Sequence, residues 1–274
     1  MPLLRCASLL TCALKSLGDL HEVLFLGLKI DERSAWQLRA CEDAPDQRVR
    51  DLSEIFAMVL FALDTCGICP KSLCNNHPGL MDMGIGVSNV GDLSSMLTIE
   101  NCLSELESFN WSLLYDSTPI GTAKTARILA VGLNRMKLLT KLDLCFQSSA
   151  VSIFPSIAES VFLPRLKDLW FSMLNCSTQD LSRFLLRHAR TLRSCSLYGI
   201  DFRDSMFPTL LMSIRDHMKL ETLNIGDIDA HDRSVDFLGT IDNGRCFKTH
   251  GHEKIRSDIT KTLRSMRYIP LRLD

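Results

Sequence analysis

Four side chains that bind soft metal ions fall within a short stretch, at Cys66, Cys69, Cys74 and His77. Thiolate and imidazole groups are the usual ligands of tetrahedral zinc, and the glycine and proline between them would help the chain turn around an ion. The order of the four ligands differs from that of a zinc knuckle, in which histidine comes third. The alternative is a cysteine-rich loop without metal, since the chain carries 11 cysteines throughout. We therefore expect no cofactor and keep zinc as the alternative.

Motifs for catalysis or phosphate binding are missing from the sequence. Gly84, Gly86 and Gly91 lack the Lys-Ser/Thr pair that completes a phosphate-binding loop. No G-x-S-x-G, H-E-x-x-H or D-x-D-x-D-G motif occurs, and no spacing brings His, Asp and Ser together. His188 is expected on a helix surface, near the C-terminal end where a basic side chain is favourable. The sequence thus predicts a protein that is not an enzyme and has no small-molecule substrate.

The segment from about 245 to 274 is locally basic, with eight Lys or Arg and two acidic residues between Arg245 and Arg272. Such a segment can contact nucleic acid. Its apolar side chains, however, recur at helical spacing, at Ile255, Ile259, Leu263 and Met266. This spacing favours a helix that caps the last structural unit. Because 31 basic residues nearly balance 32 acidic ones in the whole chain, we expect no binding to nucleic acid or membranes.

The elements that would position these residues come from an internal repeat. Four segments follow the pattern L-x-x-L-x-L and begin at Leu139, Leu166, Leu192 and Leu220, 27, 26 and 28 residues apart. The alternation is that of a half-buried strand. Residues 123–136, 177–189 and 204–218 carry apolar side chains at helical spacing, and Ser177 with Asp180 resembles a helix N-cap. Each unit is therefore a strand, a turn and a helix.

One such unit cannot bury its apolar face alone, so neighbouring units must stack. The prediction is a single α/β domain over residues 1–274: a leucine-rich-repeat-like curved solenoid with parallel strands on the concave face and helices on the convex face. Clear repeats occupy 139–228 and weaker ones 1–30 and 103–138. A helix is expected near 51–63, an irregular loop at about 65–92, and the basic C-terminal cap at about 245–274.

Two positions depart from the usual repeat, in which the ninth residue is Asn or Cys. The ninth position is expected to add to the core and holds Gln147, Leu174, Ile200 and Ile228. The tenth is expected in a turn or at a helix start and holds Ser148, Asn175, Asp201 and Asp229.

The cysteine count and the hydropathy indicate the compartment. An odd number of cysteines, some inside apolar strand patterns, favours a reducing environment. The N-terminal residues repeat leucine at helical spacing and are expected to form a helix rather than a signal peptide. The apolar run at 55–63 is far shorter than the ~20 residues needed to cross a bilayer. We expect an intracellular protein, in the cytoplasm or nucleus.

Residues 163–171, 177–197 and 218–225 together resemble the repeat region of fungal F-box-type leucine-rich-repeat proteins, and residues 15–25 show a similar cadence. The resemblance implies that the repeats recognise a target protein, while an F-box joins a cullin-type ubiquitin ligase. No F-box pattern occurs before Leu20. We therefore expect either a fragment or a repeat protein without the adaptor module.

In the predicted solenoid, the third, fifth and seventh positions of each repeat point out from the concave face. The partner-binding candidates there are Asp143, Asp168, Trp170, Tyr198 and Asn224. Adjacent strands lie ~4.8 Å apart, so Trp170 and Tyr198 are expected to be diagonal neighbours. Exposed Trp and Tyr are frequent binding hot spots. The alternative is that the chain after Ile228 folds over them.

The function expected from these features is a non-catalytic protein–protein interaction module. Through the resemblance, it would be the substrate-recognition region of an F-box-like ubiquitin-ligase adaptor, with a protein of unknown identity as its partner. The alternative is a zinc- or nucleic-acid-associated binding protein that acts through the loop at 66–77 and the basic C-terminal segment.

Overall fold

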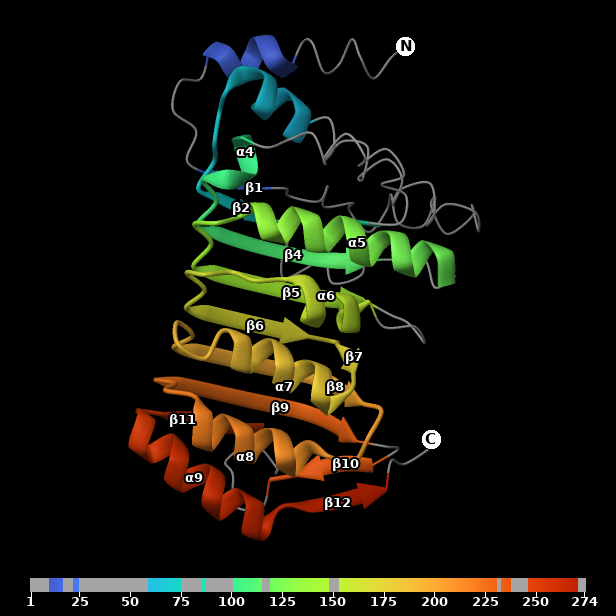
Figure 1. Ribbon diagram of the computed structural model, residues 1–274, viewed down its shortest axis with the longest axis vertical. Coiled ribbons are helices and arrows are strands. Elements are labelled where there is room, and N and C mark those ends of the chain that lie inside the picture. The colour runs from blue at the N-terminus through green and yellow to red at the C-terminus, as the bar shows by residue number, and fades with distance from the viewer. Residues whose placement is uncertain are drawn as a thin grey trace, which may run out of the picture.

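The computed structural model describes residues 10–16, 22–24, 59–74, 85–86, 101–114, 119–147, 153–230, 233–237 and 246–270. Most of the strands lie side by side in one open sheet (Figure 1). The parallel strands along it are β1 (Glu22–Leu24), β2 (Ser72–Cys74), β4 (Ser108–Leu114), β5 (Lys141–Gln147), β6 (Asp168–Ser172), β8 (Ser194–Phe202) and β9 (Thr222–Ala230). Two short strands, β3 (Ile85–Gly86) and β7 (Asn175–Cys176), add to β4 and β8.

The end of the sheet that follows β9 is antiparallel. Both β10 (Arg233–Asp236) and β11 (Cys246–His250) pair with β9, and β12 (Arg267–Pro270) pairs with β10. The mixed α/β class predicted from the sequence is thus confirmed. The antiparallel strands were not predicted, because their residues do not repeat the L-x-x-L-x-L pattern.

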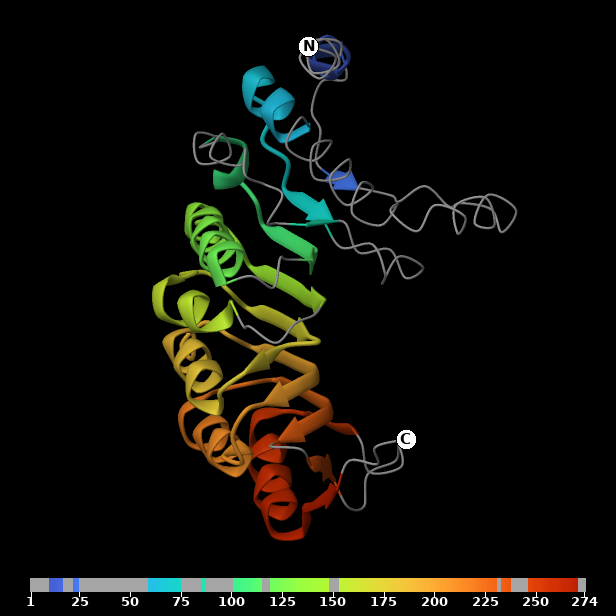
Figure 2. The ribbon, with the colours of Figure 1, turned by 90° about the vertical axis from the view of Figure 1, so that its right-hand side faces the viewer.

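The helices between the parallel strands lie on one face of the sheet (Figure 2). They are α4 (Asn101–Ser104), α5 (Pro119–Arg135), α6 (Phe154–Ser160), α7 (Thr178–Arg187) and α8 (Phe207–His217), and α9 (His252–Ser265) follows them. Successive helices pack against each other in chain order. Residues 10–16 and 59–66 are also helical, in line with the helices expected there. No helix in the described part of the chain is long and apolar enough to cross a membrane.

The start of α7 forms as the sequence predicts. The Ser177 hydroxyl oxygen accepts a hydrogen bond from the Asp180 backbone N–H at 3.1 Å and donates one to the Asp180 carboxylate at 2.6 Å. This N-cap satisfies a backbone donor that the first turn leaves without a partner. Leu181, Phe184 and Leu185 then fall on one buried face.

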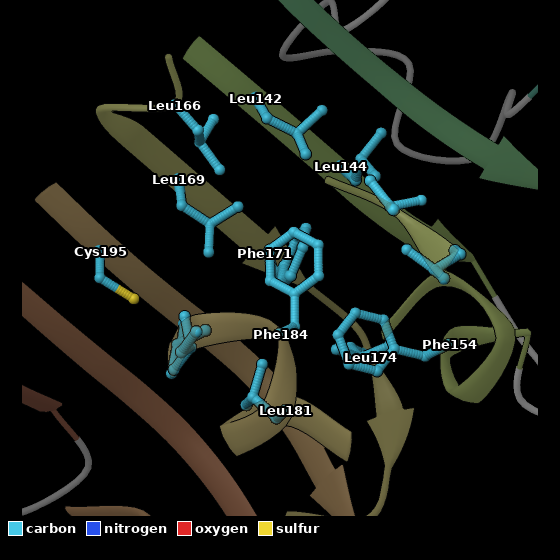
Figure 3. Packing of buried hydrophobic residues seen from close by; sticks show 14 of the residues in the cluster. Leu142, Leu144, Phe154, Leu166, Leu169, Phe171, Leu174, Leu181, Phe184 and Cys195 are labelled. Atoms are coloured by element: carbon cyan, nitrogen blue, oxygen red, sulfur yellow. The ribbon is translucent and has the colours of Figure 1, made fainter. Parts of the chain in front are cut away.

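The core lies between the helices and the sheet (Figure 3). The template leucines Leu142, Leu166 and Leu169 are at most 2% exposed. Phe171 of β6 is fully buried, and its ring centroid lies 5.7 Å from that of Phe146 and 5.4 Å from those of Phe154 and Phe184. This aromatic cluster joins β5, α6, β6 and α7, so it links consecutive repeat units.

A backbone kink recurs at the eighth position of three units. Met173, Gly199 and Asp227 have φ values of 56°, 60° and 50°. Since successive strand residues alternate between faces, the kink shifts this alternation by one residue. In these three units the ninth residue therefore turns into the core, where Leu174, Ile200 and Ile228 are at most 1% exposed, as predicted. The side chain of Gln147, the ninth residue of the first unit, lies outside the described part of the structure.

The expectation of a turn at the tenth position is wrong where the structure describes it. After the kink, β8 and β9 continue and β7 forms, so Asn175, Asp201 and Asp229 lie in adjacent strands. The Asn175 amide donates to the Asp201 carboxylate at 2.8 Å, and the Arg203 guanidinium donates to the Asn175 oxygen at 2.7 Å. In the usual repeat, asparagines at the ninth position connect adjacent units. Here a hydrogen bond between the tenth-position residues Asn175 and Asp201 connects them. Ser148 lies outside the described residues.

Of the irregular loop expected at 65–92, the structure describes residues 65–74 and 85–86, which contain β2 and β3, and the rest lies outside the described residues. Leu73 of β2 is fully buried and pairs with Phe109 of β4. The template hid this strand because Pro70 and Asn75 occupy the positions that Leu139 and Leu144 hold in the first clear repeat.

Candidate functional site

The face of the sheet opposite the helices is built from side chains in register. Parallel pairing aligns Lys141, Asp168, Ser194 and Thr222 in one row, Asp143, Trp170, Ser196 and Asn224 in a second, and Cys145, Ser172, Tyr198 and Gly226 in a third. These rows are the third, fifth and seventh repeat positions. We call this surface the open strand face.

Two neighbouring strands extend the open strand face beyond the residues considered from the sequence. On one side, β4 places Asn110 beside Asp143. On the other, β11 places Lys248 beside Asn224 and Cys246 beside Gly226. Asn110 belongs to a weaker repeat, and β11 has no repeat signal, so pattern alone did not identify them.

Trp170 and Tyr198 stack on each other at the centre of this face. Their ring centroids lie 5.2 Å apart with an interplanar angle of 22°. Trp170 is 44% exposed, and Tyr198 is partly buried. The chain after Ile228 pairs with the edge of β9 through β11 and leaves Trp170 exposed. Trp170 therefore presents a solvent-accessible aromatic ring on the open strand face.

The absence of a side chain at Gly226 leaves room for the Tyr198 ring. A Cβ atom at Gly226 would lie 2.7 Å from Cε1 of the Tyr198 ring and 2.9 Å from the Cys246 sulfur. Real Cβ atoms essentially never approach that closely. The Tyr198 ring can lie against the β9 backbone only because this position has no side chain. The β9 backbone at Gly226 is therefore one of the surfaces that hold the Tyr198 ring in its stacked position.

The polar candidates on the open strand face form short-range hydrogen bonds. The Asn110 amide donates to the Asp143 carboxylate at 2.9 Å, and the Asn224 amide donates to the Ser196 hydroxyl at 3.1 Å. Burial raises the pKa of Asp143 to about 6, although the charge of Lys141 acts in the opposite direction. Asp168 is exposed, as is Lys141. The structure thus brings Asp143, Asp168, Trp170 and Tyr198 together, with Asn224 two strands from Trp170.

The Asp143→Asn variant is expected to be more stable than wild type at pH 7.5 by about 1 kcal/mol, after allowance for the solvent that still reaches the carboxylate. The folded-state pKa lies above the ordinary value, so the folded protein takes up a proton between about pH 6 and pH 4 that the unfolded chain does not. Wild-type stability therefore gains a favourable contribution as pH falls through this window, and the variant's advantage disappears near pH 4.

Urea denaturation of both proteins at pH 7.5 and pH 4.5 measures this difference. Glu253→Gln is the control, because that side chain is 85% exposed on α9 and loses the same charge. An equal stability difference at both pH values would contradict the prediction.

The zinc candidates are only partly within the described residues. Cys66 lies at the end of the helix at 59–66, where its sulfur donates to the Thr11 carbonyl at 3.4 Å. Burial, and then the charges of Glu105 and Asp64, raise the pKa of Cys69, which opposes the thiolate that zinc binds. Cys74 lies in β2, and His77 lies outside the described residues. Within the ranges described, no group of three or more His, Cys, Asp and Glu side chains is placed to hold a metal ion.

His188 does not lie on a helix surface, as the sequence suggested, but is 1% exposed. Its Nε2 atom accepts a hydrogen bond from the Leu163 backbone N–H at 3.0 Å, and its Nδ1 lies 2.8 Å from the Phe184 carbonyl oxygen. The ring therefore carries its proton on Nδ1 and donates it to that carbonyl. His188 joins the end of α7 to the segment before β6 and has a structural role.

The basic C-terminal segment packs through α9. Ile255 and Ile259 are buried, and Leu263 and Met266 pack partly buried against the core, which are the four positions expected to face inward. The charged side chains of Lys254, Arg256, Lys261 and Arg264 are exposed on the opposite side. This helix lies against α8 beyond the last parallel strand, in the place of a cap.

Fold and site together define a mixed α/β protein with one open sheet, helices on one face and an open strand face that carries a stacked aromatic pair. No family model, curated protein or solved structure matches the chain.

Proposed function

We propose that the chain forms a leucine-rich-repeat-like curved solenoid and works as a protein–protein interaction module, without catalytic activity, whose partner binds the open strand face. The solenoid is supported by parallel strands that recur every 26–28 residues and pair without a slip in register, with a helix between each pair of strands. Repeats of this kind bury a core only by stacking, and stacking produces an extended surface of strands.

The observation that carries the binding role is the exposure of Trp170. An indole that is 44% exposed in the middle of a sheet adds little to the core. Its stacking on Tyr198 limits its motion, so little side-chain entropy is lost when a partner binds. The neighbouring positions are polar and can form the hydrogen-bonding rim of an interface.

Within this proposal, the partner is a protein that the module selects for ubiquitination, as the resemblance of residues 163–171, 177–197 and 218–225 to F-box-type repeat proteins suggests. The module then acts with the subunits of a cullin-type ligase. Recovery of those subunits together with the chain from its own cells would support this role. Their absence would argue against the ubiquitination role but not against binding of a protein partner.

The Trp170→Ala variant is expected to retain less than about a tenth of the bound partner, because truncation of an aromatic hot spot costs ~2 kcal/mol or more. The double variant Trp170→Ala/Tyr198→Ala should retain no more of the partner than Trp170→Ala alone. Affinity capture from native cells with quantitative mass spectrometry measures the loss, and thermal unfolding by circular dichroism verifies that each variant folds.

Phe162→Ala provides the matched control, because this aromatic side chain is 50% exposed and lies outside the open strand face. The proposal is wrong if Trp170→Ala captures its partner as wild type does, or if the substitution unfolds the protein.

A further inference from the structure

Two carboxylates flank Trp170 on the open strand face. Asp143 is its register neighbour on β5, and Asp168 precedes it by two residues on β6. Because strand side chains alternate between faces, Asp168 and Trp170 both point away from the core, and both are exposed. The register neighbour on the other side, Ser196, is uncharged. The surroundings of the indole are therefore acidic on one side and neutral on the other.

Among the described residues, these carboxylates have few cations close to them. In the part of the chain that the structure describes, neither Asp143 nor Asp168 forms an ion pair with N···O within 4.0 Å. Lys141 is the cation at the adjacent register position, opposite Asp168. Two acids against one base leave a local excess of negative charge beside an exposed ring.

An exposed indole next to carboxylates favours one kind of ligand group. The face of a tryptophan ring attracts cations through its quadrupole. A guanidinium group is planar, so it stacks on the ring while its N–H groups donate to carboxylate oxygens, whereas an ammonium group is more strongly hydrated and has no planar fork. Tyr198 holds the indole from the opposite side, at a centroid distance of 5.2 Å.

We propose that the surface formed by Asp143, Asp168, Trp170 and Tyr198, the acidic–aromatic surface, binds an arginine side chain of a basic peptide segment in the partner. The guanidinium stacks on Trp170 and pairs with the two carboxylates. This inference rests on the proposed function, since it names the chemistry of the partner that binds the open strand face.

Binding of a guanidinium is coupled to the protonation of Asp143. Its pKa is raised to about 6 by burial. Among the side chains that the structure describes, the charged groups that face it are Lys141 on its own strand and Asp168 on β6, whereas β4 places the uncharged Asn110 beside it. A bound cation favours the ionised carboxylate, so affinity falls as pH is lowered from 7.5 to 5.

Calorimetric titration of the purified full chain with hexa-arginine, hexa-lysine and hexa-glutamate peptides tests the proposal. Hexa-arginine is expected to bind at least about threefold more tightly than hexa-lysine, and hexa-glutamate not at all. Trp170→Leu and the double variant Asp143→Asn/Asp168→Asn should each weaken hexa-arginine binding about tenfold or more.

Two control variants match these changes elsewhere on the molecule. Phe162→Leu removes an equally exposed aromatic ring, and Glu253→Gln removes a carboxylate from α9. Both should bind hexa-arginine as wild type does. Lys141→Gln removes the competing cation and should tighten hexa-arginine binding about twofold, a gain that unfolding of the variant cannot produce. Lys261→Gln removes a cation from α9 and should leave hexa-arginine binding unchanged.

The outcomes separate this inference from the proposed function. Arginine recognition would be overturned by any one of four results. Hexa-arginine does not bind, hexa-lysine binds with the same affinity as hexa-arginine, hexa-arginine binds equally well at pH 5 and pH 7.5, or Glu253→Gln weakens hexa-arginine binding as much as the site variants do. If the cellular partner is lost with Trp170→Leu but kept with Asp143→Asn/Asp168→Asn, the open strand face binds a protein by apolar contact and the inference fails alone. If neither variant changes capture of the cellular partner, the proposed function fails as well.

Discussion

The Phe171→Ala variant is expected to unfold with a free energy about 3–5 kcal/mol lower than that of wild type. Phe171 is fully buried and stacks edge-on or tilted against Phe146, Phe154 and Phe184, so truncation removes apolar contacts with three other elements at once. The neighbouring rings are held by their own strands and helices, which limits how far they can close the cavity. Urea denaturation followed by far-ultraviolet circular dichroism measures the loss.

The same cluster provides a test of coupling between repeat units. Phe154→Ala in α6 and the double variant Phe154→Ala/Phe171→Ala complete a double-mutant cycle. Because the two ring centroids lie 5.4 Å apart, we expect the double variant to lose less than the sum of the single variants. Phe162→Ala, at a half-exposed ring, should cost under about 1 kcal/mol. A loss that small for Phe171→Ala would contradict the packing described.

Much of the fold could be predicted because the repeat signal depends on local periodicity. The spacing of Leu139, Leu166, Leu192 and Leu220 located four successive units, and each of these leucines is at most 1% exposed. The N-cap at Ser177 depends only on residues three positions apart, so it too could be read from the sequence. Local rules such as these act within one turn or one strand and do not require knowledge of the packing.

The kink at the eighth position could not be predicted in the same way. Of the three residues with positive φ there, only Gly199 is a residue that adopts this conformation without steric cost. Met173 and Asp227 are held in it by the pairing of the strands on either side, as where the Met173 N–H donates to the Tyr198 carbonyl at 2.9 Å. Tertiary context overrides local preference at these positions, and the strands continue where a turn was expected.

In the candidate site, too, some features follow from the local sequence pattern and others depend on contacts between repeat units. The rows that place Trp170 beside Tyr198 follow from repeat spacing, so the stacked pair could be predicted as diagonal neighbours. The partial burial of Asp143 depends on β4, and the close contact of Tyr198 with the β9 backbone depends on Gly226. Those features arise between units of different sequence, and no single repeat encodes them.

The His188→Ala variant is expected to lose about 3 kcal/mol of unfolding free energy at pH 7.5. The substitution leaves the Leu163 backbone N–H without its acceptor and the Phe184 carbonyl without a donor. It also removes a ring whose centroid lies 4.5 Å from that of Phe184. Urea denaturation measures the loss, and His217→Ala is the control, since that histidine is exposed at the end of α8.

The effect of His188→Ala should depend on pH in a definite direction. Burial, and to a lesser extent Arg187, lower the pKa of His188 below its usual 6.5, so the unfolded chain takes up a proton that the folded protein does not. The stabilising contribution of His188 is therefore complete above about pH 6.5 and declines as pH falls through that value. Asp143 acts in the opposite sense near the same pH but is present in both proteins, so the difference between wild type and variant isolates His188. That difference should be smaller at pH 5.5 than at pH 7.5; an increase on acidification would mean that the buried ring is a charged partner rather than a neutral bridge.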